Sequence, residues 1–189
     1  MGRILDATSD EGAILKQGGA ALRRLCKTES WLPPDMAQPS PERYQQYLLH
    51  LDAFCRFSVV SFVWAGGQST PIHNHRTWGL VGVLHGLEAS QRYEPGRDGR
   101  LAPAGPPSVG HPGNVEAISV QEGDIHQVSN ALEKETTISI HAYGGNIGSI
   151  ARSTFTVDGR ASGFVSGYTA VLDPARLWPP DVKVTRRRR

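Results

Sequence analysis

From residue 56 onwards, short runs of β-branched and aromatic residues are separated by glycine and proline. The first run, 57–64, is rich in Val and Phe, ends in Trp64 and is followed by Gly66 and Gly67. Such runs favour strands, and the 21 glycines and 13 prolines of the chain are enough to end many of them. We therefore expect a mainly β fold. The expected strands are 57–64, 79–84, 87–93, 117–120, 125–128, 136–143 and 163–171, with a long loop at 95–113.

The segment before residue 56 has a different pattern. Apolar residues recur at helical spacing over 11–27, which predicts a helix. A proline-rich connector at 32–39 follows, and then Ser40 as N-cap and Pro41 at the first helical position predict a second helix that ends near Leu51. Two helices before many short strands indicate a β-barrel or sandwich with a helical cover.

A chain of 189 residues is long enough for one domain with its own core. We expect a single domain over 1–189, with a helical cover at about 1–52, a β-barrel at 56–172 and a C-terminal tail at 173–189. The net charge of +2 includes the terminal run 186–189, so the folded body is nearly neutral and does not favour nucleic-acid binding.

The sequence contains neither a signal-peptide core nor an apolar stretch of the roughly 18 residues that a spanning helix needs. We therefore expect a cytoplasmic protein that is not embedded in a membrane. Cys26 and Cys55 belong to no metal-binding spacing, and in a cytosolic protein both are expected to be reduced thiols. The pattern is compatible with a monomer or a small homo-oligomer.

His73 and His75 stand two residues apart, so in an extended strand their imidazoles share a face and can bind one metal ion. His126 is the best third ligand, because Gly123 and Asp124 predict a turn that delivers it to the start of a strand. The alternative is that these histidines are ordinary surface or hydrogen-bonded residues.

A second polar set lies along the expected strand 136–143. Ser139, His141 and Tyr143 alternate with apolar residues, so all three share one face. A hydroxyl, an imidazole and a phenol in line can form a hydrogen-bonded chain that ends near a metal and moves a proton. The alternative is the polar outer face of a half-buried strand.

The spacing of these histidines among glycines resembles the two-part signature of the cupin proteins. The matching residues are Gly67, His73, His75, Gly123, His126 and Asn130. The resemblance implies a double-stranded β-helix barrel, or jelly roll, with a metal in its mouth. Gly79 and Leu80 stand where the signature usually has a Glu ligand, and Gln121 stands where it usually has Pro. The loss of the Glu leaves a site of three neutral imidazoles.

Between about 40 and 155 the chain resembles the cysteine dioxygenase family, especially its bacterial 3-mercaptopropionate dioxygenases. The matching segments are 43–49, 71–75, 78–82 and 139–144. The resemblance implies that Fe(II) is held by His73, His75 and His126, and that Ser139, His141 and Tyr143 form an outer relay. It also implies that a small thiol reacts with O2 to give a sulfinic acid.

Substrate choice in this family depends on two further positions. The cysteine enzymes place an Arg, which binds the substrate carboxylate, where this chain has Gln46, and a neutral amide cannot replace that charged clamp. By resemblance, Arg152 supplies the charge from another direction. Mammalian cysteine dioxygenases also crosslink a Cys to the relay Tyr, but 78–80 contains no Cys here. We therefore expect 3-mercaptopropionate or L-cysteine as substrate, and no crosslink.

Two alternatives to a thiol dioxygenase remain at this stage. One is a non-catalytic metal-binding cupin that senses a small ligand, and the other is a cupin oxygenase or isomerase of a non-thiol substrate. His50, His85 and His111 lie outside the motifs and are expected to be structural or solvent-facing.

Overall fold

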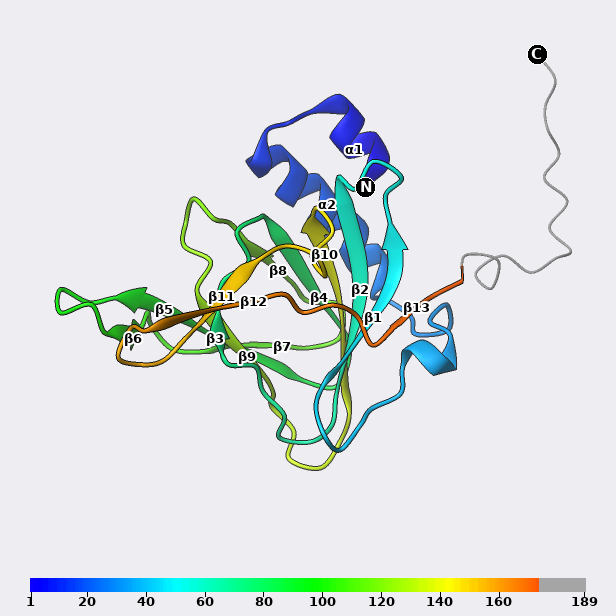
Figure 1. Ribbon diagram of the computed structural model, residues 1–189. Coiled ribbons are helices and arrows are strands. Elements are labelled where there is room, and N and C mark those ends of the chain that lie inside the picture. Colours follow the sequence, from blue (N-terminus) through cyan, green and yellow to red (C-terminus); the bar gives the residue numbers. More distant parts are fainter. Residues whose placement is uncertain (174–189) are drawn as a thin grey trace, which may run out of the picture.

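Two mostly antiparallel sheets make up the body of the computed structural model, which describes residues 1–173 (Figure 1). The first sheet has the order β13 (Ala170–Val171), β1 (Gln45–Leu51), β2 (Phe57–Trp64), β10 (Thr137–Gly144), β4 (Gly79–His85) and β8 (Val115–Ile118). The second has the order β12 (Ala161–Phe164), β11 (Arg152–Phe155), β3 (Ile72–His73), β9 (His126–Asn130), β5 (Glu88–Pro95) and β6 (Leu101–Pro103), and β7 (Ser108–Gly110) also pairs with β5.

Neighbours in each sheet are mostly distant in sequence, because the chain passes repeatedly from one sheet to the other. β10, for example, lies between β2 and β4 and pairs antiparallel with both. This interleaved order is that of a double-stranded β-helix. The expected mainly β, cupin-type jelly-roll barrel is therefore confirmed.

The N-terminal helix α2 (Glu11–Leu25) lies against β4 and β8 on the outer face of the first sheet, and the short helix α1 (Gly2–Ala7) packs against α2 (Figure 1). Asp10 caps α2 by accepting a hydrogen bond from the Ala13 amide at 2.7 Å. Leu22 of α2 belongs to the same buried cluster as Leu80 and Ile140. The helix expected at 11–27 is thus confirmed.

The second expected helix, from Ser40 to Leu51, is wrong. Residues Gln45–Leu51 form strand β1, which pairs antiparallel with β2 and parallel with β13. Both of its faces are covered. Leu48 lies in one buried cluster, together with Val60, and Leu49 lies in a second buried cluster, together with Leu22 of α2. A strand buried on both sides has a nearly continuous apolar run, and sequence periodicity does not distinguish such a run from a helix.

The expected strand 57–64 is found with the same bounds as β2, the other expected strands are found with shifted ends, and the segment 163–171 divides between β12 and β13. The long segment 95–113 is not entirely a loop, because β6 and β7 lie within it and both pair with β5. The short strands β3 and β11 were not expected. A further short 3-10 helix, η1 (Pro34–Met36), lies in the proline-rich connector.

Cys26 is buried and Cys55 is exposed, and both are free, as expected. His50, His85 and His111 are exposed, which confirms their assignment to the surface. Within residues 1–173, no helix combines the length and the apolar character needed to cross a bilayer. The terminal run 186–189 lies outside the described residues.

Candidate metal centre and active site

Three histidines from two segments meet on the inner face of the second sheet. His73 of β3 pairs directly with His126 of β9, and His75 follows two residues after His73. One ring nitrogen from each of the three lies within 4.8 Å of the others. The strand register thus brings together the three residues that the sequence predicts as ligands.

The turn after β3 is held by a carboxylate from the segment before β9. Asp124 Oδ2 accepts hydrogen bonds from the backbone amides of His75 at 2.7 Å and Arg76 at 2.8 Å. Arg76 has a φ of 59°, a left-handed conformation that is uncommon for a residue other than glycine. The two amide contacts hold this turn, and they thereby fix the direction of the His75 side chain.

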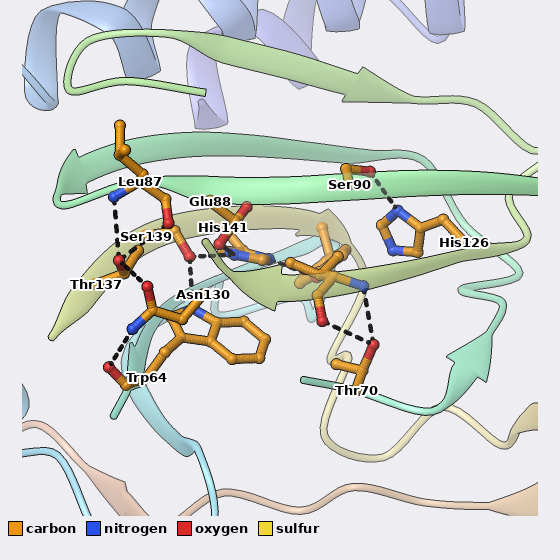
Figure 2. A network of polar contacts seen from close by, with 12 residues as sticks. Trp64, Thr70, Leu87, Glu88, Ser90, His126, Asn130, Thr137, Ser139 and His141 are labelled. Atoms are coloured by element: carbon orange, nitrogen blue, oxygen red, sulfur yellow. Dashed lines mark hydrogen bonds and ion pairs between the residues drawn. The ribbon is translucent and has the colours of Figure 1, made fainter. Parts of the chain in front are cut away.

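Hydrogen bonds determine which imidazole nitrogens are free. His73 Nδ1 donates to the Pro71 carbonyl at 3.0 Å, and His126 Nδ1 contacts Ser90 Oγ at 3.2 Å (Figure 2). His126 Nε2 and both ring nitrogens of His75 are buried without a hydrogen-bond partner. Buried nitrogens of this kind need a partner, and a divalent metal ion is one that binds neutral imidazole.

Burial lowers the pKa of all three imidazoles: to about 4 for His73, and well below the ordinary value for His75 and His126. The neutral form, which is the metal-binding form, is therefore the stable one at neutral pH. Three neutral nitrogen donors fit Fe(II) and several other divalent ions.

Ser139, His141 and Tyr143 form a continuous buried chain along β10. His141 Nε2 lies 2.8 Å from Ser139 Oγ, and His141 Nδ1 lies 2.7 Å from the Tyr143 hydroxyl. Trp64 Nε1 donates to Ser139 Oγ at 3.2 Å (Figure 2), and Phe62 stacks on His141 with ring centroids 4.1 Å apart. Ser139, His141 and Tyr143 are all buried, which excludes the alternative of a polar outer face.

Tyr143 connects this chain to the histidine cluster. Its ring stacks on that of His75, with centroids 5.4 Å apart and planes inclined by 17°. Burial raises the pKa of the Tyr143 phenol well above its ordinary range, an effect that the charge of Arg152 partly opposes. The free site therefore keeps a protonated phenol beside the histidines.

A cavity of about 190 Å³ opens between the two sheets at this point. It is lined by Tyr44, Gln46, Phe62, Trp64, Thr70, Pro71, His73, His126, Val128, His141, Tyr143, Arg152, Thr154, Phe164 and Ser166. Both residues that the sequence suggests for substrate binding, Gln46 and Arg152, are among them. Because β1 is a strand whose Gln46 pairs with Phe62, Gln46 reaches the cavity from a sheet rather than from the expected helix.

Arg152 is the cationic side chain of this cavity, and it is only 6% exposed. One of its terminal nitrogens donates to Ser166 Oγ at 2.7 Å, and its guanidinium carbon lies 4.7 Å from the centre of the Phe164 ring. Its Nε has no hydrogen-bond partner, and the ion pairs found among residues 1–173 do not include it. Burial accordingly lowers its pKa.

The side chain of Asn130, the last matching residue of the cupin signature, connects neighbouring segments by hydrogen bonds. Its side-chain amide donates to the backbone carbonyls of Trp64 at 3.3 Å and Glu135 at 2.7 Å, and its Oδ1 accepts from Thr137 Oγ1 at 2.7 Å (Figure 2). These contacts tie the end of β2 to the segment that connects β9 to β10, and so help to hold Trp64 against Ser139.

Several residues of the site carry no recognisable motif. Trp64 contacts Ser139, Ser90 and Asp124 each contact one of the three clustered histidines, and Glu88 of β5 lies 3.8 Å from His141. The one available signal was the alternation of polar Glu88 and Ser90 with Ala89, which predicts that both face the same side of a strand.

No protein-family model matches the chain. Several solved structures are similar to it. An uncharacterised conserved protein with a double-stranded β-helix domain from Klebsiella pneumoniae shares 15% identity, with a TM-score of 0.47 over 70% of this chain and 87% of that one. A cupin superfamily protein from Desulfitobacterium hafniense shares 14%, with a TM-score of 0.44 over 58% and 84%. An RmlC-like cupin from Desulfovibrio desulfuricans shares 22%, with a TM-score of 0.36 over 57% and 89%.

Proposed function

We propose that this protein is a non-haem Fe(II) thiol dioxygenase, which adds both atoms of O2 to the sulfur of a small thiol carboxylate. The product is a sulfinic acid, and the preferred substrate is 3-mercaptopropionate rather than L-cysteine. The observation that carries the proposal is the buried, unpaired guanidinium of Arg152 in the same small cavity as three neutral imidazoles and a tyrosine relay.

The buried positive charge of Arg152 favours a substrate with a negative charge. A buried guanidinium without a carboxylate partner is costly, and a ligand carboxylate in the cavity would supply two charge-assisted hydrogen bonds. Gln46 of β1, in the other sheet, also lines the cavity and offers amide contacts but no charge. The cavity volume of about 190 Å³ favours a ligand of only a few heavy atoms.

Within residues 1–173, the acidic side chains that could pair with a substrate amine are missing from the lining of this cavity, and this favours a substrate without an amine. None of the cavity's lining residues within the described part of the chain is Asp or Glu, so the ammonium group of L-cysteine would have no counter-charge there. 3-Mercaptopropionate brings a carboxylate for Arg152 and a thiol for the histidine cluster. It leaves no buried charge unpaired.

His73, His75 and His126 would hold the iron, which when bound supplies a centre that favours thiolate over thiol and reacts with O2. The protein's own contribution is orientation and proton handling. Arg152 holds the carboxylate end, Phe62 and Trp64 limit the space, and the Tyr143 hydroxyl lies at the inner wall. The conversion of RSH and O2 to RSO2H needs no external reductant.

The decisive experiment is oxygen uptake by iron-loaded protein with a panel of small thiols, with sulfinate detected by mass spectrometry. We expect turnover of 3-mercaptopropionate with the largest kcat/KM, and weaker turnover of L-cysteine. Binding of the thiols without oxygen uptake would indicate a metal-binding sensor. Oxygen uptake with a non-thiol carboxylate alone would indicate a different cupin oxygenase. Either result would overturn the proposal.

A further inference from the structure

Glu88 is a buried carboxylate that no step above uses. It lies on β5 and is 5% exposed, and Figure 2 shows its side chain beside His141. Its Oε2 lies 3.8 Å from His141 Nε2 and has no hydrogen-bond partner. Two residues further along the same face, Ser90 contacts the ligand His126. Glu88 therefore lies next to Nε2 of His141, whereas Tyr143 contacts Nδ1 of the same ring.

A carboxylate in this position is costly unless a positive charge accompanies it. Arg92, on the same strand, directs its guanidinium to the Glu122 carbonyl at 2.6 Å, and Glu116 of β8 contributes charge of the same sign as Glu88. The distance of 3.8 Å is too long for a hydrogen bond but short enough for strong attraction in a buried site. A second proton on the His141 ring, which would make the imidazole positive, is thus the charge that can compensate the Glu88 carboxylate at this distance.

We propose that Glu88 is a positioning residue that enables His141 to hold the proton released by the substrate thiol, an inference that rests on the proposed function. Ser139 Oγ, 2.8 Å from His141 Nε2, accepts the proton of that nitrogen, so that Nδ1 accepts from the Tyr143 hydroxyl at 2.7 Å, while the Glu88 carboxylate lies 3.8 Å from Nε2. When the S–H bond breaks, the Tyr143 oxygen takes that proton while its own proton passes to Nδ1. His141 then carries two ring protons beside the Glu88 carboxylate.

The step conserves charge, because the proton lost by the thiol is gained by His141. In the complex the substrate carboxylate pairs with Arg152, and the protonated His141 pairs with Glu88. The thiol proton stays inside the protein until the sulfinate leaves, and no oxidant or reductant other than O2 is needed.

Other titratable groups surround this pair and are part of any pH response. They are Tyr143 on the same strand, Glu116 from β8, the histidine cluster from β3 and β9, and Arg152 from β11. Glu116 provides a control, because it is a half-buried acid near the buried Glu88 but hydrogen-bonds Ser108 at 3.2 Å. Both acids line a separate cavity of about 300 Å³.

The test compares wild type, Glu88→Gln, Glu88→Asp and Glu116→Gln as full-length protein loaded with zinc, which is suitable for NMR. Calorimetry in two buffers of different ionisation enthalpy counts the protons released when 3-mercaptopropionate binds. We expect almost none from wild type and Glu116→Gln, and about one per site from Glu88→Gln. Nitrogen-15 spectra should show that His141 gains a second ring proton on binding in wild type but not in Glu88→Gln.

In the iron-loaded protein, Glu88→Gln should lower kcat/KM by about 10- to 100-fold at unchanged metal content, the scale of a lost proton-transfer partner. Glu88→Asp should restore most of the rate. If wild type releases a full proton on thiol binding, the inference is wrong even though the proposed function stands. If Glu88→Gln does not fold, the wild-type proton count and spectra decide alone.

Failure of the proposed function gives a different result, because then no thiol binds or turns over. In that case the ligand-free spectra still test Glu88. An identical His141 protonation pattern from pH 5 to 8 in wild type and Glu88→Gln would show that the carboxylate does not control the imidazole. That result would overturn the inference for any substrate.

Discussion

Tyr143 lies directly opposite Gly79 across the β10–β4 pair, and a Cβ atom added to Gly79 would stand 3.1 Å from ring carbons Cδ1 and Cε1 of Tyr143. The tyrosine ring therefore packs against bare backbone. Its position between Gly79 and the His75 ring depends on the missing side chain, which makes Gly79 a packing determinant of the relay.

Gly79→Ala should displace the Tyr143 ring by a few tenths of an ångström, because the added methyl is tighter than an ordinary contact. We expect normal metal content and a loss of kcat/KM of about tenfold, since small misplacements of catalytic groups are costly. Steady-state oxygen uptake measures the effect. Gly163→Ala, where the nearest atom would lie 4.0 Å away, is the control and should behave as wild type.

No thioether should link Tyr143 to a cysteine. Cys26 lies on the outer face of the first sheet, where its sulfur packs against Gly82, and Cys55 is exposed. Mass spectrometry of peptides that contain Tyr143 should therefore give the unmodified mass after turnover with iron and O2. A peptide crosslinked to either cysteine would contradict the structure.

Replacement of a ligand histidine should remove the metal while leaving the fold largely intact. For His73→Ala, His75→Ala and His126→Ala we expect metal affinity to fall by more than about 100-fold, beyond the effect typical of outer residues. Metal analysis after dialysis, with circular dichroism for the fold, checks this. His85→Ala, which removes an exposed partner of Glu29, should retain the metal. Full metal content in all three ligand variants would refute the cluster.

Arg152→Ala should cost about 2–4 kcal/mol of transition-state stabilisation for 3-mercaptopropionate, the scale of a desolvated charged hydrogen bond. This corresponds to a fall in kcat/KM of roughly 30- to 700-fold. Gln46→Arg introduces the Arg with which the cysteine enzymes that this chain resembles bind the substrate carboxylate, and it should shift preference towards L-cysteine. Arg160→Ala, which removes an exposed partner of Asp158, is the control. A wild-type preference for L-cysteine that neither substitution changes would show that these residues do not select the substrate.

The metal-free protein should lose stability as the pH falls from about 6.5 to about 4. The pKa of folded His73 is about 4, below its ordinary value of 6.5, so the unfolded chain binds more protons between these values. The contribution of His73 is complete above pH 6.5 and is lost on acidification, by on the order of 3 kcal/mol. Urea unfolding across this range measures it. His73→Asn should reduce the slope but not abolish it, because burial also lowers the pKa values of His75 and His126; an unchanged slope in that variant would contradict the assignment.

The relay shows what local pattern can predict. Side chains two residues apart in a strand share a face whatever the strand packs against, so the alternation of Ser139, His141 and Tyr143 already implied a line of contacts. The same two-residue spacing predicted that His73 and His75 lie close together. His75 nevertheless lies beyond the end of β3, and the direction of its side chain depends on the contact of its backbone amide with Asp124.

The error at Gln45–Leu51 shows the limit of that reasoning. Ser40 and Pro41 are genuine helix-start signals, but the segment that follows gains two strand partners and is buried on both faces. Tertiary pairing of this kind overrides local preference, because it gives the backbone of β1 hydrogen-bond partners in β2 and β13 while burying Leu48 and Leu49.

The sequence by itself determined the mainly β character, the three imidazole donors and the order of the relay, since these depend on residue type and on the two-residue period of a strand. Only the tertiary structure decided that Glu88 stands behind His141 and that Arg152 enters the cavity without a carboxylate. The physical reason is that burial and charge compensation depend on which strands lie side by side, and those strands are far apart along the chain.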